Sequence, residues 1–179
     1  RNLMMYRVML FTNLLRNRLR NQFQAIDFYQ DKVNFNTQEF AQLATHINAP
    51  QFVLENIQKS LVQYLKSAEI SDIIYHDLKQ HVIELGAIQA GCDRILSTPL
   101  PYSYSVLLHR TVYCFCIILP FSLESTLGFW TPVIVGLIAY LFLGLDALSA
   151  ELEEPFGLQE NDLALDSMTR LIEREMLSS

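Results

Sequence analysis

One apolar block near the end of the chain limits the folds that are open to it. Residues 111–148 contain no Lys, Arg or His, and only Glu124 and Asp146 carry charge across these 38 positions. As a helix the block is about 57 Å long, close to two crossings of a ~30 Å hydrocarbon core. A water-soluble domain rarely needs such a stretch. The sequence therefore predicts a membrane protein whose apolar part lies near the C-terminal end.

Charged residues divide between the two ends of the 179-residue chain. Residues 1–26 hold five arginines and no acid, whereas residues 146–175 hold nine acids against two arginines. The net charge of −6 thus conceals a basic start and an acidic end. No nucleic-acid-binding motif accompanies the arginines, so they predict a cytoplasmic face near lipid headgroups and no nucleic-acid partner.

Helical spacing of apolar residues marks the part before the apolar block. It predicts an amphipathic helix over 1–25, a loop over 26–36, a short helix over 37–46 and a further helix opened by Asn48 and Pro50. The first helical repeat has no capping residue before it, so we expect further sequence upstream.

Ser71 can cap a long helix that ends near Leu96. The residues expected on its inward face are Ile74, Leu78, Val82, Leu85, Ile88, Cys92 and Ile95. Ile73, next to the cap, is taken by itself as an ordinary core isoleucine.

The apolar block itself divides into two predicted helices. They cover 104–119 and 131–148, and the break between them runs from Pro120 to Gly128. Two such helices form a hairpin whose ends lie on the same side of the membrane. Arg94 and Arg110 precede the hairpin and its connection carries no cation, so the positive-inside rule places both termini in the cytoplasm.

A last amphipathic helix follows an acidic turn. Its apolar face is predicted to consist of Leu165, Met168, Leu171, Ile172 and Met176. No strand pattern competes anywhere, so the expected fold is all-α, with a cytosolic helical region over 1–103, a transmembrane hairpin over 104–150 and an acidic turn with a cytosolic helix over 151–179.

Acidic residues are densest around that turn. They are Glu151, Glu153, Glu154, Glu160, Asp162 and Asp166. Glu151 and Glu154 share a helix face, and the Pro-Phe-Gly turn could bring Glu160 or Asp162 back toward them to make an oxygen-rich pocket for a hard cation such as Ca²⁺. A solvated acidic surface explains the same composition, and both alternatives stay open at this point.

Other polar residues give weaker patterns. Asp72 and His76 share a helix face that excludes His81, so a metal site there is less expected than packing or surface contacts. No nucleophile motif, phosphate loop or zinc-protease motif is present. The sequence therefore predicts that the chain is not an enzyme.

Three stretches together resemble a known family. Residues 97–102 leading into 109–113, then 144–157, then 161–163, are similar to the bacterial bestrophin homologues, a family of ion channels. The acidic helix end followed by Pro-Phe-Gly and Asn-Asp is the most specific part. The resemblance implies a funnel- or barrel-like homopentamer around a central pore, with the hairpin as the third and fourth of four membrane helices per subunit.

The resemblance also implies partners and a location. They are sister copies of the chain, the lipid bilayer of the bacterial inner membrane, and small monovalent ions that pass the pore without energy input. Family members differ between anion and cation preference, so the selectivity stays open. The hydrophobic neck on the family's second membrane helix has no match here, which agrees with the expectation of upstream sequence.

Particular residues gain roles through the resemblance alone. The family's apolar constriction at the cytosolic mouth falls on Ile73. The Ca²⁺ clasp of animal bestrophins falls on Glu151, Glu154, Gln159 and Asp162, where Gln159 replaces a carboxylate. The cluster is therefore expected either to bind Ca²⁺ or to hold the cytosolic helices together, and no other cofactor is implied.

Two alternatives compete with the channel. One is a membrane-anchored helical scaffold that conducts nothing and binds partners through its acidic C-terminal segment. The other, a membrane enzyme using Glu151 and Glu154 with a metal, is weak because no histidines or further acids lie at suitable spacing in the adjoining helices.

Overall fold

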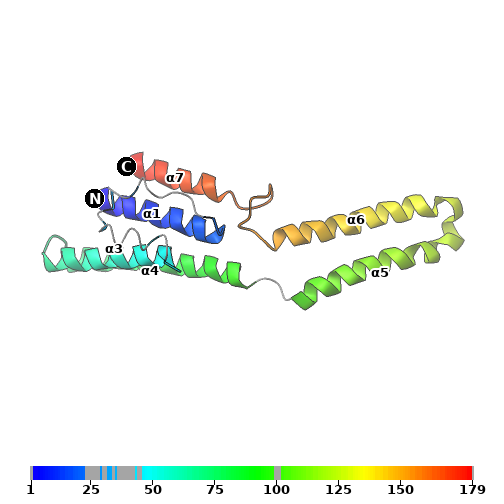
Figure 1. The fold of residues 1–179 in the computed structure, drawn as a ribbon, viewed down its shortest axis with the longest axis horizontal. Coiled ribbons are helices and arrows are strands. Elements are labelled where there is room, and N and C mark those ends of the chain that lie inside the picture. Colours follow the sequence, from blue (N-terminus) through cyan, green and yellow to red (C-terminus); the bar gives the residue numbers. More distant parts are fainter. Residues whose placement is uncertain are drawn as a thin grey trace. The chain divides into compact units, whose positions relative to one another are not determined.

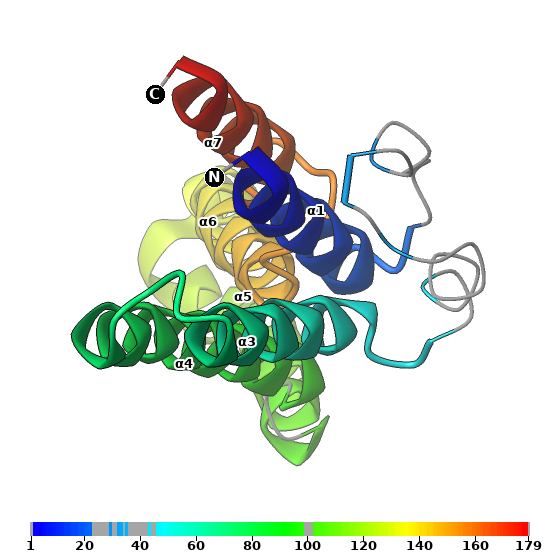
Figure 2. The ribbon, with the colours of Figure 1, turned by 90° about the vertical axis from the view of Figure 1, so that its left-hand side faces the viewer.

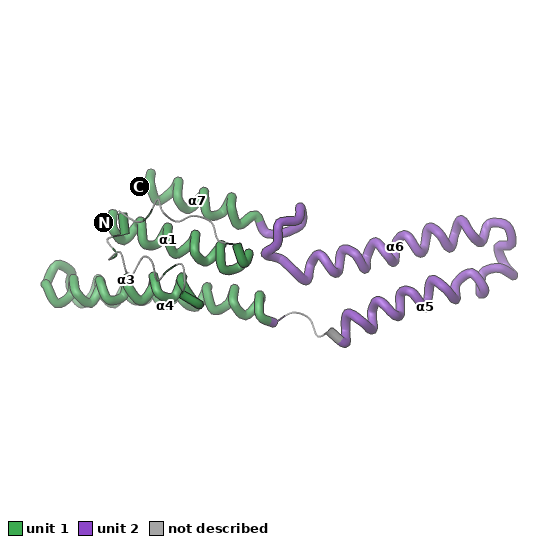
Figure 3. Tube along the Cα trace, in the orientation of Figure 1, with its two compact units in different colours: residues 1–97, 164–179 green, residues 98–163 purple. Residues whose placement is uncertain are grey.

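The computed structural model describes residues 2–22, 29, 32–33, 35, 43, 46–98 and 102–178. Within these residues every regular element is a helix (Figure 1), which confirms the predicted all-α fold for the described part of the chain. The chain divides into two compact units (Figure 3): unit 1 is residues 1–97 with 164–179, and unit 2 is residues 98–163.

Unit 1 combines the first and the last helix of the chain with the two helices that precede the apolar block. They are α1 (Asn2–Leu19), α3 (Ala49–Lys66), α4 (Asp72–Ser97) and α7 (Leu165–Ser178). Helix α1 lies between α7 and the α3–α4 pair (Figures 1 and 2). The C-terminal helix therefore packs with the N-terminal helices.

The core of unit 1 is built mainly from α1 and α3. Its buried apolar residues include Met9, Leu10, Phe11, Leu14, Val53, Leu54, Ile57 and Leu61. Their spacing of three and four residues puts them on one face of each helix. Partly buried apolar side chains such as Val8, Leu15 and Leu85 pack against this core.

Capping residues start the helices of unit 1 as the sequence predicts. Asn48 accepts a hydrogen bond from the Gln51 backbone N–H at 3.3 Å, and Pro50 follows in the first turn of α3. The Ser71 hydroxyl accepts from the Ile74 N–H at 3.4 Å at the start of α4. The predicted loop over 26–36 and helix over 37–46 lie largely outside the described residues.

The predicted end of the first helix is wrong. Helix α1 stops at Leu19, not at residue 25, and Asn21 has a positive φ of 48°. A residue in this left-handed region ends a helix, and Asn is one of the residue types that tolerates it.

The predicted inward face of α4 is only partly right. Val82 and Leu85 do pack against the core, but Ile74, Ile88 and Ile95 are at least half exposed. The packed face is rotated, and its centre carries the buried side chain of Gln89, which donates to Asn48 Oδ1 at 2.8 Å. Apolar residues cover more than one face of α4, so their spacing could not identify which face meets α3.

The apolar face expected for α7 is also wrong in part. Ile172 and Met176 turn inward, whereas Met168 and Leu171 are about half exposed, at 48% and 53%. Thr169 takes the buried position between them, with its hydroxyl bonded to the Leu165 carbonyl at 2.8 Å.

Arginines of α1 find partners inside the chain, where the sequence led us to expect lipid headgroups. Arg16 lies 3.3 Å from the Asp166 carboxylate, Arg20 contacts the same carboxylate, and Arg18 lies 2.7 Å from Asp93. Asp166 of the acidic end thus pairs with two arginines of the basic start, and Arg18 pairs with α4.

Unit 2 is a helical hairpin. Helix α5 (Tyr102–Leu127) and helix α6 (Thr131–Leu152) run side by side (Figure 1) and are joined by the short 3₁₀ turn η2 (Gly128–Trp130). The predicted break at Pro120 is wrong, because α5 continues through it. A proline removes one N–H from the helix, and membrane helices tolerate this loss. The chain reverses direction after α5, at Gly128, whose φ is +50°.

Candidate functional site

The outer surface of the hairpin is apolar and unburied. The helical stretch Ser103–Leu152 contains a window with a mean hydropathy of 2.1, and none of that window is buried. Phe129, Tyr140 and Leu145 are 92%, 75% and 64% exposed. A core helix of a water-soluble protein would be covered by its neighbours, so this surface is suited to lipid.

Polar and aromatic contacts hold α5 against α6. Ser105 donates to Glu153 Oε1 at 2.8 Å, and His109 Nδ1 lies 2.5 Å from Asp146 Oδ1. Farther along the hairpin, the rings of Phe115 and Phe142 meet edge to face with centroids 5.3 Å apart. The hairpin is therefore joined by polar groups near its open end and by aromatic packing nearer the turn.

A small polar cavity of about 30 Å³ lies between the two helices beside the His109–Asp146 contact. It is lined by Tyr104, Ser105, Leu108, His109, Asp146, Ser149, Ala150 and Glu153. Its volume is close to that of one water molecule, which several of these polar groups could bind. The sequence patterns did not indicate that His109 and Asp146 meet.

Ile73 lies in the first turn of α4 and is 82% exposed. It is therefore not the core residue that the sequence alone favoured. Val82, which packs against the core, lies nine residues away on the same helix. At 3.6 residues per turn this is about two and a half turns, so Ile73 points to the side of α4 opposite its packed face.

The acidic turn after α6 is a compact loop closed by its own hydrogen bonds. Asp162 Oδ2 accepts from the Gln159 N–H at 2.6 Å, and Asn161 donates to Glu151 Oε2 at 2.6 Å. The Leu163 N–H donates to the Pro155 carbonyl at 3.0 Å. Of the predicted clasp residues, Gln159 and Asp162 therefore come together directly.

Gly157 leaves room for the Asp162 carboxylate in this turn. A Cβ at this position would lie 2.5 Å from Asp162 Oδ2, which is well inside van der Waals contact. Phe156 beside it is buried, at 7% exposure. The Pro-Phe-Gly sequence thus lets the chain fold back over the Asp162 carboxylate.

Acidic side chains of the turn take part in hydrogen bonds within it. Calcium takes six to eight oxygen ligands, whereas the Glu151 and Asp162 carboxylates already accept hydrogen bonds from within the turn. Among the residues that the structure describes, no group of three or more His, Cys, Asp or Glu side chains could hold a metal ion.

The histidines of α4 are engaged in local contacts. His81 lies 3.3 Å from Glu84 on the same helix, and the ring of His76 meets that of Tyr75 edge to face at 5.8 Å between centroids. These are the surface and packing contacts that the spacing of the two histidines along the helix favoured over a metal site.

Two further polar contacts join α7 to the rest of unit 1, and the sequence did not point to them. Asn13 donates to Glu173 Oε1 at 2.7 Å, and the Tyr29 hydroxyl donates to the same carboxylate. Burial raises the pKa of Tyr29 well above its ordinary value, and the hydrogen bond to Glu173 raises it further. These contacts act with the Arg16 and Arg20 pairs to hold α7 on α1.

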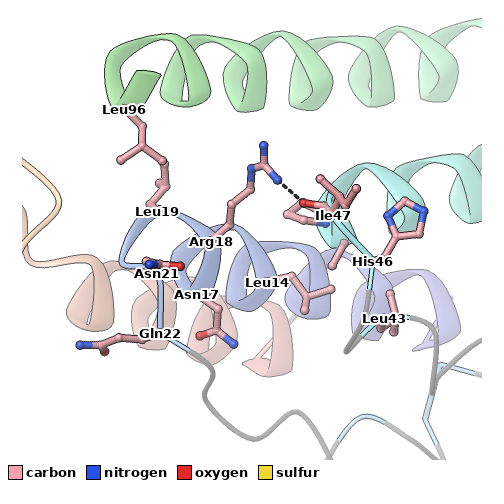
Figure 4. A pocket seen from close by; sticks show the side chains of 12 residues that line it. Leu14, Asn17, Arg18, Leu19, Asn21, Gln22, Leu43, His46, Ile47 and Leu96 are labelled. Carbon is pink, nitrogen blue, oxygen red and sulfur yellow. Dashed lines mark hydrogen bonds between the residues drawn. The ribbon is translucent and has the colours of Figure 1, made fainter. Parts of the chain in front are cut away.

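A cavity of about 560 Å³ lies in unit 1 (Figure 4). Its walls include Leu14 and Asn17 of α1 and Ile47 before α3. Arg18 projects into it, but its guanidinium already donates to the Ile47 carbonyl at 2.5 Å and to Asp93 at 2.7 Å. Because those contacts occupy the one positive charge in the wall, we assign this cavity no ligand.

Comparison with known proteins identifies relatives of the whole chain. The family model described as "Bacterial/Fungal Bestrophin protein" matches residues 1–178. The "Voltage-dependent anion channel-forming protein YneE" of Salmonella typhi is 42% identical over 169 residues, covering 93% of this chain and 54% of the relative. A protein of the same description from Mesorhizobium japonicum, mll4386, is 40% identical and covers 87% and 50%. The chain thus spans about half the length of these relatives.

Solved structures agree with this. A crystal structure of a bacterial bestrophin homologue from Klebsiella pneumoniae, solved by Zn-SAD phasing, has a TM-score of 0.88 at 32% identity, covering 97% of this chain and 64% of that one. A mutant of the Klebsiella homologue has a TM-score of 0.90 at 31% identity. The curated relatives above are named as channel-forming proteins, which agrees with the prediction that the chain is not an enzyme.

Proposed function

The chain belongs to the bacterial and fungal bestrophin family, and from that premise we propose that it is part of a subunit of a pentameric channel that conducts small monovalent ions passively across the bacterial inner membrane. Anions are the first candidates, because the curated relatives are named as anion channel-forming proteins. The hairpin of α5 and α6 would lie in the bilayer and both termini in the cytoplasm.

The observation that carries this proposal is the exposure of Ile73. Ile73 is 82% exposed at the start of a 26-residue helix, so its burial against sister copies would be favourable. Five copies around a common axis would turn these side chains into an apolar ring. Such a ring gates by dewetting or restricts ions by size, and we propose Ile73 as the cytosolic constriction.

For the acidic turn we propose a structural role. Glu151 and Asp162 accept hydrogen bonds that close the turn, while Glu154 and Gln159 remain on its exposed side. In this role the cluster fixes the connection between α6 and α7 without a bound cation. A calcium titration tests it, because a rise in Tm at micromolar Ca²⁺ that Asp162→Asn abolishes would instead support the clasp.

Ion flux through liposomes tests the main proposal. We expect protein reconstituted in liposomes to release trapped chloride, and Ile73→Ala to raise the flux of larger anions over that of chloride because the ring widens. Leu177→Ala is the matched control, since Leu177 is an apolar side chain 60% exposed on α7.

Two results would contradict the proposal. One is a protein that remains monomeric in mild detergent, and the other is liposomes that show no flux with either chloride or potassium. A stable assembly without flux would favour the non-conducting scaffold.

A further inference from the structure

The turn of the hairpin presents two aromatic rings to its surroundings. Phe129 and Trp130 of η2 are 92% and 64% exposed. Gly128 has a positive φ of 50°, and the chain reverses there and carries both rings at the end of the hairpin. We call Phe129 and Trp130 the aromatic turn. Two large exposed rings side by side in the sequence indicate an interaction surface.

Polar groups accompany the aromatic turn. Ser122, Glu124, Ser125 and Thr126 are exposed on the last part of α5. No Lys, Arg or His lies anywhere in residues 111–148. This mixture of rings and uncharged polar groups is typical of the headgroup level of a bilayer, where tryptophan is enriched. Tryptophan suits that level because its large apolar ring system also carries an N–H donor.

The length of the hairpin places the aromatic turn at a definite depth. The polar contacts at the open end start from Ser105 and His109 of α5, and α5 ends at Leu127. The helix rises about 27 Å from His109 to Leu127 and about 33 Å from Ser105 to Leu127. A hydrocarbon core is about 30 Å thick. The polar end and the aromatic turn are therefore separated by the thickness of one hydrocarbon core.

We propose that the aromatic turn is a docking surface for the headgroup layer of a phospholipid bilayer and that Trp130 fixes the depth of the hairpin there. The indole N–H would donate to an ester or phosphate oxygen of a lipid, while the Phe129 ring enters the adjoining acyl region. This inference rests on the proposed function for the placement of the hairpin in a bilayer. It adds the residues that hold the hairpin and the part of the lipid that receives them.

Depth-dependent quenching of Trp130 fluorescence tests the docking surface. The protein is reconstituted in phosphatidylcholine vesicles whose acyl chains carry bromine either near the ester groups or near the methyl end. Trp130 is the one tryptophan of the 179 residues, and the difference in emission between the wild type and Trp130→Phe isolates its signal. We expect that signal to fall more with bromine near the ester groups, because the indole lies at the interface.

Leu141→Trp, introduced together with Trp130→Phe, is the matched control. Leu141 is 55% exposed, which is close to the exposure of Trp130. It follows Trp130 by 11 residues, so it lies about 16 Å farther along the hairpin. We expect the emission from position 141 to fall more with bromine near the methyl end, because this position is near the middle of the hydrocarbon core.

The two positions separate a failure of this inference from a failure of the proposed function. If neither emission falls, the hairpin does not lie in the bilayer and both are wrong. If bromine quenches position 141 but does not quench Trp130 most strongly near the ester groups, the docking surface alone is wrong. Quenching of Trp130 near the ester groups with none at position 141 supports the docking surface and shows that protein covers that side of α6.

Discussion

Unit 1 buries Phe11 at 2% exposure inside a core made by its own helices, whereas unit 2 leaves Phe129 at 92%. The two units therefore satisfy their apolar side chains differently. Unit 1 has an internal core built from its own helices. The α5–α6 hairpin has too little internal contact to cover its surface, and its apolar side chains need lipid or a neighbouring subunit.

Polar groups differ in the same way. In unit 1, buried Arg7 donates to the Val33 carbonyl at 3.0 Å and to Ser60 Oγ at 2.5 Å. In unit 2, polar contacts gather at the open end of the hairpin, at Glu153 and Asp146. Water reaches that end more readily than the middle of a bilayer, so the location of the polar contacts marks the expected membrane boundary.

The largest expected effect is a difference in the free energy of unfolding between substitutions of the two phenylalanines. Phe11→Ala removes a fully buried ring and should lower the free energy of unfolding by about 3–5 kcal/mol. Phe129→Ala removes an exposed ring at the hairpin turn and should change it by less than about 0.5 kcal/mol. Chemical denaturation followed by far-UV circular dichroism measures both. Equal losses would show that the hairpin turn is packed against protein.

The second effect concerns the medium around the hairpin. Leu141→Lys places a charge near the middle of α6, where insertion should become less favourable by about 2.5–3.5 kcal/mol. Leu177→Lys is the control, because the two leucines are similarly exposed, at 55% and 60%. Partition of the protein between membrane and soluble fractions measures the difference. Equal membrane fractions for both variants would contradict a bilayer around α6.

Much of this division was predictable because it follows from local chemistry. The absence of cations from 111–148 predicted the hairpin, and the caps at Asn48 and Ser71 predicted where α3 and α4 begin. A cap uses atoms within a few residues of itself, so a single sequence contains what is needed.

The failures came from contacts between distant residues. Arg16 and Asp166 lie far apart in the sequence, and nothing local shows that α7 returns to α1. The His109–Asp146 contact depended on the position of the turn. His109 precedes Gly128 by 19 residues and Asp146 follows it by 18, so the two residues meet because the chain reverses at Gly128 and not at the predicted break at Pro120.

A smaller effect is expected at the acidic turn. Gly157→Ala adds a Cβ that would lie 2.5 Å from Asp162 Oδ2, and the resulting crowding should lower stability by about 1–3 kcal/mol. Gly144→Ala in α6 is the matched control, since a Cβ there meets nothing within 4 Å. Hydrogen exchange at the Gln159 amide should quicken in the first variant. Unchanged exchange would show that the Asp162 contact does not close the turn.

The smallest expected effect is a loss of stability at alkaline pH that involves the α1–α7 contact in unit 1. The pKa of Tyr29 is raised by burial and by its hydrogen bond to Glu173, so the unfolded chain ionises first as the pH rises above about 10. The stability that Tyr29 contributes is therefore present below that pH and is lost above it, at a slope of up to about 1.4 kcal/mol per pH unit.

The Tyr29→Phe side chain cannot ionise, so the free energy of unfolding of this variant should not show the decrease that Tyr29 causes at alkaline pH. At neutral pH the variant should be about 1 kcal/mol less stable than the wild type, because it lacks the hydrogen bond of the hydroxyl. Tyr64→Phe in α3 is the control, and its free energy of unfolding should follow that of the wild type both at neutral pH and above about pH 10. Cys92, whose pKa is also raised by burial, is present in all three proteins, so its contribution cancels. Parallel stability curves for Tyr29→Phe and the wild type above about pH 10 would mean that the hydroxyl is exposed to water and does not hold α7 on α1.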